Sequence, residues 1–250
     1  MRIFKHWALI FTLLLCFTIT GCGTLNVGTK TVINNKGAGT ITFKISSEGI
    51  YEQVLSGNEN NNNLFNLKNK NIQKKAFKEG EKSIEEYTLK FNNIKEFNDL
   101  FKDVKKDEIK IEIKENKSLF KITYQYKLYL PKGFSLDELS KEALNNNKAG
   151  QPQDLEIVSP EQVKAFLGSS IVFSNEIVVP GKVEVTNAVS TSASNNVNTL
   201  KWSYSLSQIN PNNPLIATYS ISNKTNIALV SGISIVAVAA IAFIILKKKK

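Results

Sequence analysis

The feature that most constrains this chain of 250 residues is an apolar run near its C-terminus, from Ile227 to Leu246. Coiled as an α-helix, a run of this length rises about 30 Å, which matches the hydrocarbon core of a bilayer. No charged residue interrupts the run, and the few small residues in it suit a spanning helix. We therefore predict one transmembrane helix over residues 226–246.

Four lysines follow this run directly, namely Lys247, Lys248, Lys249 and Lys250. Basic residues that flank an apolar helix stay on the cytoplasmic side of the membrane. Residues 247–250 are therefore predicted to form a cytoplasmic tail that determines the topology. The domain that precedes the helix is then expected on the extracytoplasmic face.

The N-terminus has the three parts of a secretory signal peptide over residues 1–21: a basic start, an apolar run and a short polar stretch. The tetrapeptide Ile19-Thr20-Gly21-Cys22 resembles the lipobox of bacterial lipoproteins. This resemblance implies cleavage before Cys22, which would then carry a diacylglyceryl thioether and, in many bacteria, an N-acyl chain such as palmitate. The alternative is an ordinary signal peptide that is cut nearby without lipid attachment.

Residue types that the processed chain would lack exclude several kinds of chemistry. It would have no histidine, and Cys22 would be its one cysteine. Triad hydrolysis and Cys-His catalysis need an imidazole, and zinc or redox sites need His or Cys ligands. We therefore predict a protein that is not an enzyme and has no metal or cofactor other than the covalent lipid on Cys22. The net charge of +10 comes largely from the two termini, which favours a membrane role over nucleic-acid binding.

Between the two apolar ends, the pattern predicts an α+β fold. Alternating residues at 25–33 and 41–45, joined by a Gly-bearing turn, predict a β-hairpin. Helices are expected after Asn93, over 136–145 and over 160–168, because each begins with capping residues. Further strands are expected at 87–91, 109–113, 119–130, 171–179, 183–186, 200–206 and 215–221.

These elements predict a mainly antiparallel sheet with two or three amphipathic helices, plus the C-terminal transmembrane helix. Residues 22–225 would form the extracytoplasmic domain, with an internal boundary, if there is one, near 145–152. Residues 56–71 are polar and Asn-rich, which is typical of a surface loop.

The strand at 119–130 supplies a candidate ligand site. Its aromatic residues Phe120, Tyr124 and Tyr126 share one face and could line an apolar groove. Alternating apolar residues on a strand more often belong to the core.

A glycoside hydrolase site is a second possibility, because a pair of carboxylates can cleave glycosides. The candidate carboxylates are Glu85, Glu86, Asp107, Glu108, Glu112 and Glu115. Among so many lysines, we interpret these as solvated partners of basic residues.

The order of features along nearly the whole chain resembles the LppM-like bacterial lipoproteins. It consists of the lipobox, the early hairpin, an α+β domain, the segment Val179-Pro180-Gly181-Lys182-Val183, a strand centred on Trp202 and one C-terminal membrane helix. The resemblance implies a single-pass protein of the bacterial cytoplasmic membrane that binds envelope lipid or glycolipid. The Asn-rich insertion and the single arginine, Arg2, depart from that pattern.

Two functions follow as expectations. The first is a non-enzymatic cell-envelope lipoprotein that binds lipid, glycolipid or a neighbouring membrane protein. The alternative is a structural or assembly subunit of a membrane protein complex. Because Cys22 and Ile227 would both lie at the outer face of one bilayer, both ends of the domain are expected on its membrane side.

Overall fold

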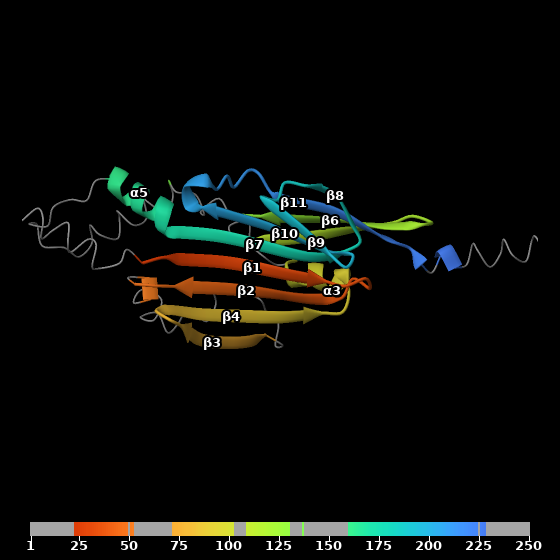
Figure 1. Cartoon of the computed structure of the whole chain (residues 1–250), viewed down its shortest axis with the longest axis horizontal. Helices are drawn as coiled ribbons and strands as arrows, with labels where there is room; N and C mark the ends of the chain where they lie inside the picture. The colour runs from red at the N-terminus through yellow and green to blue at the C-terminus, as the bar shows by residue number, and fades with distance from the viewer. Residues whose placement is uncertain are drawn as a thin grey trace, which may run out of the picture.

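Two β-sheets pack face to face in the computed structural model of this protein, and one core fills the space between them (Figure 1). The structure describes residues 23–49, 51–52, 72–102, 109–130, 137, 160–224 and 226–228. The fold is mixed α+β with mostly antiparallel strands, as the sequence predicts. Among the described strands, β1 and β7 form the one parallel pair.

The larger sheet has seven strands in the order β3-β4-β2-β1-β7-β10-β9. Their bounds are β1 Leu25–Ile33, β2 Gly39–Ser47, β3 Gln73–Glu79, β4 Lys82–Phe91, β7 Ile171–Pro180, β9 Ser190–Ser194 and β10 Val197–Ser205. The smaller sheet has the order β5-β6-β11-β8. Its strands are β5 Lys110–Lys117, β6 Lys121–Tyr129, β8 Lys182–Thr186 and β11 Leu215–Ser222. The helices are α3 Ile94–Leu100, α5 Pro160–Ser170 and the short 3-10 helix η2 Leu206–Gln208.

The predicted hairpin and two of the predicted helices are confirmed. Residues 25–33 pair antiparallel with residues 39–47. The side chain of Asn93 accepts a hydrogen bond from the Glu96 N–H at the start of α3, so it is the cap that the pattern predicts. The helix that begins at Pro160 extends to Ser170, two residues beyond the predicted end.

Strands β3 and β9 are absent from the sequence prediction. Both lie at edges of the larger sheet. Neither strand packs a face against the core, so neither needs a row of apolar side chains. Strand β3 is charged and mostly exposed, and all five residues of β9 are exposed. Neither therefore shows the alternation of apolar and polar residues by which a half-buried strand is recognised.

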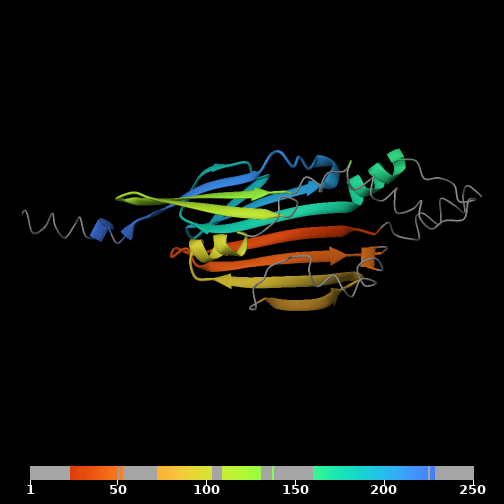
Figure 2. The same ribbon diagram turned by 180° about the vertical axis from the view of Figure 1, so that it is seen from behind.

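Alternating apolar residues of both sheets build the core, and α3 extends it. The smaller sheet and α3 lie on the same face of the larger sheet (Figure 2). Phe97 of α3 is fully buried and meets Phe91 edge-on with ring centroids 4.9 Å apart. Phe101 lies 5.3 Å from Phe97 and 6.3 Å from Phe43 of β2. An aromatic cluster thus covers the part of the larger sheet that the smaller sheet leaves open.

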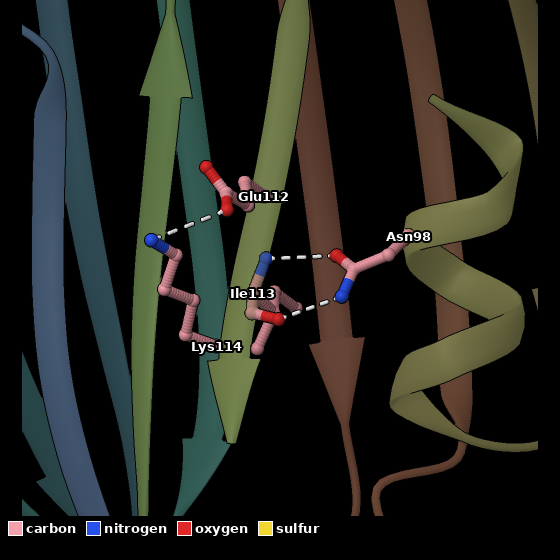
Figure 3. Close-up of polar contacts among 4 residues, drawn as sticks. All are labelled: Asn98, Glu112, Ile113 and Lys114. Carbon is pink, nitrogen blue, oxygen red and sulfur yellow. Dashed lines mark hydrogen bonds and ion pairs between the residues drawn. The ribbon is translucent and has the colours of Figure 1, made fainter. Parts of the chain in front are cut away.

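Asn98 of α3 closes one edge of the smaller sheet (Figure 3). Its side-chain oxygen accepts from the Ile113 N–H at 2.9 Å, and its Nδ2 donates to the Ile113 carbonyl at 2.7 Å. The side-chain amide thus takes the place of a neighbouring strand's peptide group. Because β5 is an edge strand, these two backbone groups would otherwise face away from any strand.

Replacing Asn98 with alanine is expected to lower the free energy of unfolding by about 1–3 kcal/mol, because it leaves two part-buried backbone groups without partners. Urea denaturation followed by Trp202 fluorescence measures the change. Asn98→Asp is the matched control: its carboxylate can accept from the Ile113 N–H but has no donor for the carbonyl, so it should recover only part of the loss. An Asn98→Ala midpoint equal to that of the native chain would show that the edge is held by packing alone.

On the outer face of the larger sheet, one carboxylate lies between two lysines. Glu176 of β7 pairs with Lys30 of β1 at 2.9 Å and with Lys201 of β10 at 3.3 Å. Partial burial of Glu176 would raise its pKa, but hydrogen bonds from Lys30 and Lys201 outweigh that effect and hold the pKa below its usual value.

Glu176→Gln is therefore expected to destabilise the fold only above acid pH. A carboxyl whose pKa is lower in the folded chain stabilises that state above its unfolded pKa, about 4.3, and loses the effect as pH falls. Since both lysines are more than half exposed, we expect a loss of about 0.5–1 kcal/mol at pH 7 that approaches zero near pH 3. Denaturation at the two pH values measures it. An equal loss at both would point to packing instead of charge.

Several predicted features lie outside the described residues. These are the signal peptide 1–21 with Cys22, the loop 56–71, the helix at 136–145, the boundary at 145–152, most of the transmembrane span 226–246 and the tail Lys247–Lys250. No helix within the described ranges is both long enough and apolar enough to cross a membrane.

The two ends of the described domain lie at opposite ends of the strands (Figures 1 and 2). Strand β1 begins beside Ile171, at the first residue of β7, and β11 runs to Ser222 at the far end. The nine residues of β1 alone span roughly 30 Å. The two ends therefore do not lie at the same end of the strands. They can face the same membrane only if the strands run along its surface.

Candidate functional site

The end of the sandwich where β11 finishes carries an open cleft of about 1160 Å³. Five turns or strand ends meet there: the β1–β2 turn, the start of β6, the β7–β8 corner, the β9–β10 turn and the residues after β11. The lining residues are Asn35, Lys36, Phe120, Lys121, Ile122, Pro180, Gly181, Lys182, Asn195, Asn196, Val197, Ser220, Ile221, Ser222, Asn223 and Lys224.

Asn223 fixes the chain that leaves this cleft. Its backbone N–H donates to the Phe120 carbonyl at 2.9 Å, and its Nδ2 donates to the Ser118 carbonyl at 3.0 Å. The Asn223 carbonyl accepts from the Ile227 N–H at 3.0 Å, as in the first turn of a helix. Asn223 thus joins the β5–β6 hairpin to Ile227, the first residue of the apolar run.

Gly181 forms the corner where the chain passes from the larger sheet to the smaller one. Its φ of +80° is in the left-handed region, and a Cβ there would lie 2.1 Å from the Ser220 carbonyl oxygen. The Gly181 N–H donates to the Asn196 carbonyl at 2.9 Å, and the Gly181 carbonyl accepts from Asn198 Nδ2 at 2.6 Å. A glycine is therefore required for β7–β8 and β11 to approach closely enough to form the wall of the cleft.

The cleft is basic. Four of its lining residues are lysines, Lys36, Lys121, Lys182 and Lys224, and no carboxylate is among the lining residues. The nearest acidic partner is Glu184, which pairs with Lys121 and accepts from the Ser220 hydroxyl. The hydrogen bonds from Lys121 and Ser220 lower the pKa of Glu184, so it stays ionised and offsets one lysine. The other three lysines give the cleft a net positive charge.

Large apolar side chains are exposed beside these lysines. Leu119 is 53% and Phe120 is 54% exposed at the β5–β6 turn, and Ile227 is 36% exposed at the start of the apolar run. Asn223 ties the backbone of this turn to the chain just before Ile227. An apolar tip with a positively charged surround is the pattern of a surface that contacts an anionic membrane.

The three aromatic residues of the predicted groove are separated in the structure. Phe120 lines the cleft, whereas Tyr124 and Tyr126 are 3% and 0% exposed and belong to the core. Tyr124 stacks on Tyr219 at 5.1 Å, and Tyr126 stacks on Trp202 at 6.4 Å. Tyr126 therefore joins the smaller sheet to Trp202 of the larger one, and Tyr124 packs on its neighbour within the smaller sheet. Neither tyrosine lines a groove with Phe120.

Both tyrosine hydroxyls are bonded inside the protein. Tyr126 donates to Asn175 Oδ1 at 3.1 Å, and Tyr124 donates to Glu115 at 3.0 Å. Burial raises the pKa of each phenol, and for Tyr124 the neighbouring Glu115 carboxylate raises it further. Both phenols are therefore neutral hydrogen-bond donors at physiological pH.

The carboxylates considered for glycoside cleavage pair with lysines where the structure describes them. Glu85 pairs with Lys74, Glu86 with Lys44, Glu112 with Lys114 and Glu115 with Lys117. A hydrogen bond from Tyr87 and the contact with Lys74 lower the pKa of Glu85, so it is ionised and is not a proton donor at neutral pH. Asp107 and Glu108 lie outside the described residues. Within the described ranges, no group of three or more His, Cys, Asp or Glu residues could hold a metal ion.

Sequence reasoning missed this cleft because its parts are scattered along the chain. Lys36, Lys121 and Lys182 each lie next to a turn between a different pair of strands, and Lys224 follows the last strand, β11. No local motif connects them, and only the folding of the two sheets brings them together. Phe120 was predicted to lie on the strand 119–130, but it lies in the turn that precedes β6.

Comparisons with known proteins give one structural likeness. No family model matches the sequence, and no curated protein matches it. The structure is similar to the folded domain of Mycobacterium tuberculosis LppM, solved by NMR, with a TM-score of 0.42 and 7% sequence identity. The likeness covers 81% of this chain and 93% of that one. A similarity at this level assigns neither a family nor a function to the chain.

Proposed function

We propose that this chain is a doubly anchored bacterial cell-envelope lipoprotein, without enzymatic activity, whose extracytoplasmic domain binds anionic lipid head groups in the basic cleft. One observation carries the proposal. The cleft is open, is lined by four lysines without a carboxylate, and lies directly beside the start of the apolar run. A lipid head group at the outer surface of the bilayer would lie close to this end of the domain, because the apolar run begins there.

Lysine side chains bind anionic head groups differently from arginine side chains. Its ammonium is a compact charge with three donors, whereas arginine binds phosphate through a planar fork. The described part of the chain contains no arginine. The cleft should therefore select for negative charge more than for the geometry of one phosphate ester. Each lysine near an anionic surface contributes about 1 kcal/mol, and partial insertion of Leu119 and Phe120 adds to that.

The two proposed anchors restrict how the domain lies. Cys22 immediately precedes Gly23, which is buried at one end of the strands, and the apolar run begins four residues after Asn223 at the other end. Neither end has a long linker. If both anchors sit in one bilayer, the strands must run along its surface, because an upright domain would hold Cys22 more than 30 Å above it.

Binding of the segment 23–228 to vesicles tests the proposal. We expect it to sediment with vesicles that contain phosphatidylglycerol and to remain in solution with phosphatidylcholine alone. Raising the salt concentration should weaken the binding, because exposed charges are screened. Lipids extracted with the purified segment from cognate membranes should be enriched in anionic species by mass spectrometry. Equal binding to both kinds of vesicle would contradict the proposal.

A second candidate is a structural or assembly subunit, and a separate observation favours it. Val189, which is 64% exposed, immediately precedes β9, an uncharged edge strand of the larger sheet. That surface has no lysine cleft and would bind protein instead of lipid.

A further inference from the structure

Each of the two sheets ends in two edge strands, and three of these four edges are protected against pairing. Strand β3 carries Lys74, Lys75, Lys78 and Glu79 among its seven residues. Strand β5 is charged along its length and has Asn98 bound to its central residue. Strand β8 is five residues long, has Lys182 and Glu184, and shifts register against β11 at Thr218 and Tyr219. Charges, side-chain caps and irregular register are the devices by which natural sheets prevent edge pairing.

Strand β9 is as short as β8, but it has no charge and no register shift, and no described side chain caps it. Its sequence is Ser-Thr-Ser-Ala-Ser over Ser190–Ser194, without charge or proline. All five residues are exposed, and β9 pairs with β10 in regular register over its whole length. A two-residue turn with positive φ at Asn195 and Asn196 connects the two strands and fixes their register. The free side of β9 is therefore a ready template for another strand.

One exposed valine accompanies this edge. Val189, immediately before β9, is 64% exposed. It lies at the opposite end of β9 from the β9–β10 turn, which lines the cleft. An uncharged edge with an exposed apolar side chain beside it is open to pairing with a strand of another protein.

We propose that β9 pairs antiparallel with β9 of a second copy of this chain, which joins the two larger sheets into one. Full overlap of two five-residue strands places Ser192 opposite Ser192 of the second copy. Ser190 then lies opposite Ser194, and Thr191 opposite Ala193. Val189 would flank the ladder at both of its ends.

A second copy fits this edge for two reasons. Because β9 has no charge, bringing two identical edges together causes no repulsion. Its side chains are all small, so neither face of the strand prevents close approach.

A five-residue ladder is smaller than a standard protein interface. A partner confined to the same bilayer gains the effective concentration that such a small interface requires. This gain in effective concentration rests on the proposed anchoring. Antiparallel pairing is compatible with the anchoring, since two domains whose strands run along the bilayer can point in opposite directions while both stay on its surface.

Disulfide trapping of the full-length chain in membranes tests the inference. Ser192→Cys is expected to form a disulfide-linked dimer on mild oxidation, because directly opposite residues have Cα atoms about 4.5–5.5 Å apart. Ser190→Cys should give at least tenfold less dimer, because its counterpart lies four residues along, about 13 Å away. Coexpressed Ser190→Cys and Ser194→Cys chains should link to each other. The unaltered chain is the control for any disulfide that forms through its own Cys16 or Cys22.

A blocking variant completes the test. Thr191→Lys added to Ser192→Cys should reduce the dimer at least tenfold, and since Thr191 is exposed, unchanged Trp202 fluorescence should show that the fold is intact. Three results would overturn the inference: no dimer from folded Ser192→Cys, equal dimer from Ser190→Cys, or linkage of Ser192→Cys to a different protein. If the chain proved to be unanchored while Ser192→Cys still linked, the anchoring would fail and the pairing would stand.

Discussion

Replacing Lys36, Lys182 and Lys224 together with glutamine is expected to weaken binding of the segment 23–228 to phosphatidylglycerol vesicles by about 100-fold. Each lysine contributes about 1 kcal/mol near an anionic surface, and three such contributions correspond to slightly more than a factor of 100. Lys121 is left in place because Glu184 already pairs with it. Vesicle sedimentation over a range of lipid concentrations measures the change.

The matched control removes the same charge from the opposite end of the domain. Lys82, Lys110 and Lys127 lie toward the end of the strands that is far from the cleft. Their replacement with glutamine changes the net charge by the same amount but leaves the cleft intact. We expect this control to weaken binding less than tenfold. If both triple variants lose affinity equally, the domain binds by its overall charge and the cleft is not the site.

Gly181→Ala is expected to lower the free energy of unfolding by about 3 kcal/mol or more. Two effects combine at this position. An L-residue in the left-handed region costs about 1–2 kcal/mol. A Cβ that lies 2.1 Å from the Ser220 carbonyl also forces backbone to move, which adds strain where two sheets meet. Urea denaturation followed by Trp202 fluorescence gives the value.

Gly80→Ala separates the two effects. Gly80 has a similar φ of +63°, but a Cβ there would meet nothing within 4 Å. Its replacement should therefore show the conformational effect alone, about 1–2 kcal/mol. If the two variants are destabilised equally, close approach at Gly181 is unimportant and the wall of the cleft tolerates a side chain.

The elements with strong local signals could be predicted from the sequence. The first hairpin alternates apolar and polar residues and has a turn of Asn and Gly, and the structure confirms it. The helix after Asn93 has a capping side chain and an apolar stripe, of which Ile94, Phe97 and Phe101 are buried. In both cases the local pattern and the tertiary packing agree, which is why periodicity was sufficient.

Features that depend on contacts distant in the sequence could not be predicted. The parallel pairing of β1 with β7 joins residues more than 140 positions apart, and nothing in either strand specifies its neighbour. The fates of Phe120 and Tyr126 differ because β6 begins at Lys121, later than the predicted strand 119–130. Phe120 therefore lies in the exposed turn before β6, whereas Tyr126 lies inside the strand and is buried. Predicting the cleft would have required the relative positions of five turns or strand ends.

We propose that two anchors hold this domain against one bilayer, and membrane fractionation tests this claim most directly. Cys22→Ala is predicted to leave the full-length protein in the membrane fraction, because the apolar run Ile227–Leu246 would still span the bilayer. Cys22→Ala combined with truncation before Asn226 is predicted to release the domain. Fractionation of cells that express each form, with carbonate washing, measures both results. Release of the protein by Cys22→Ala alone would show that the apolar run is not a stable span and would contradict the claim.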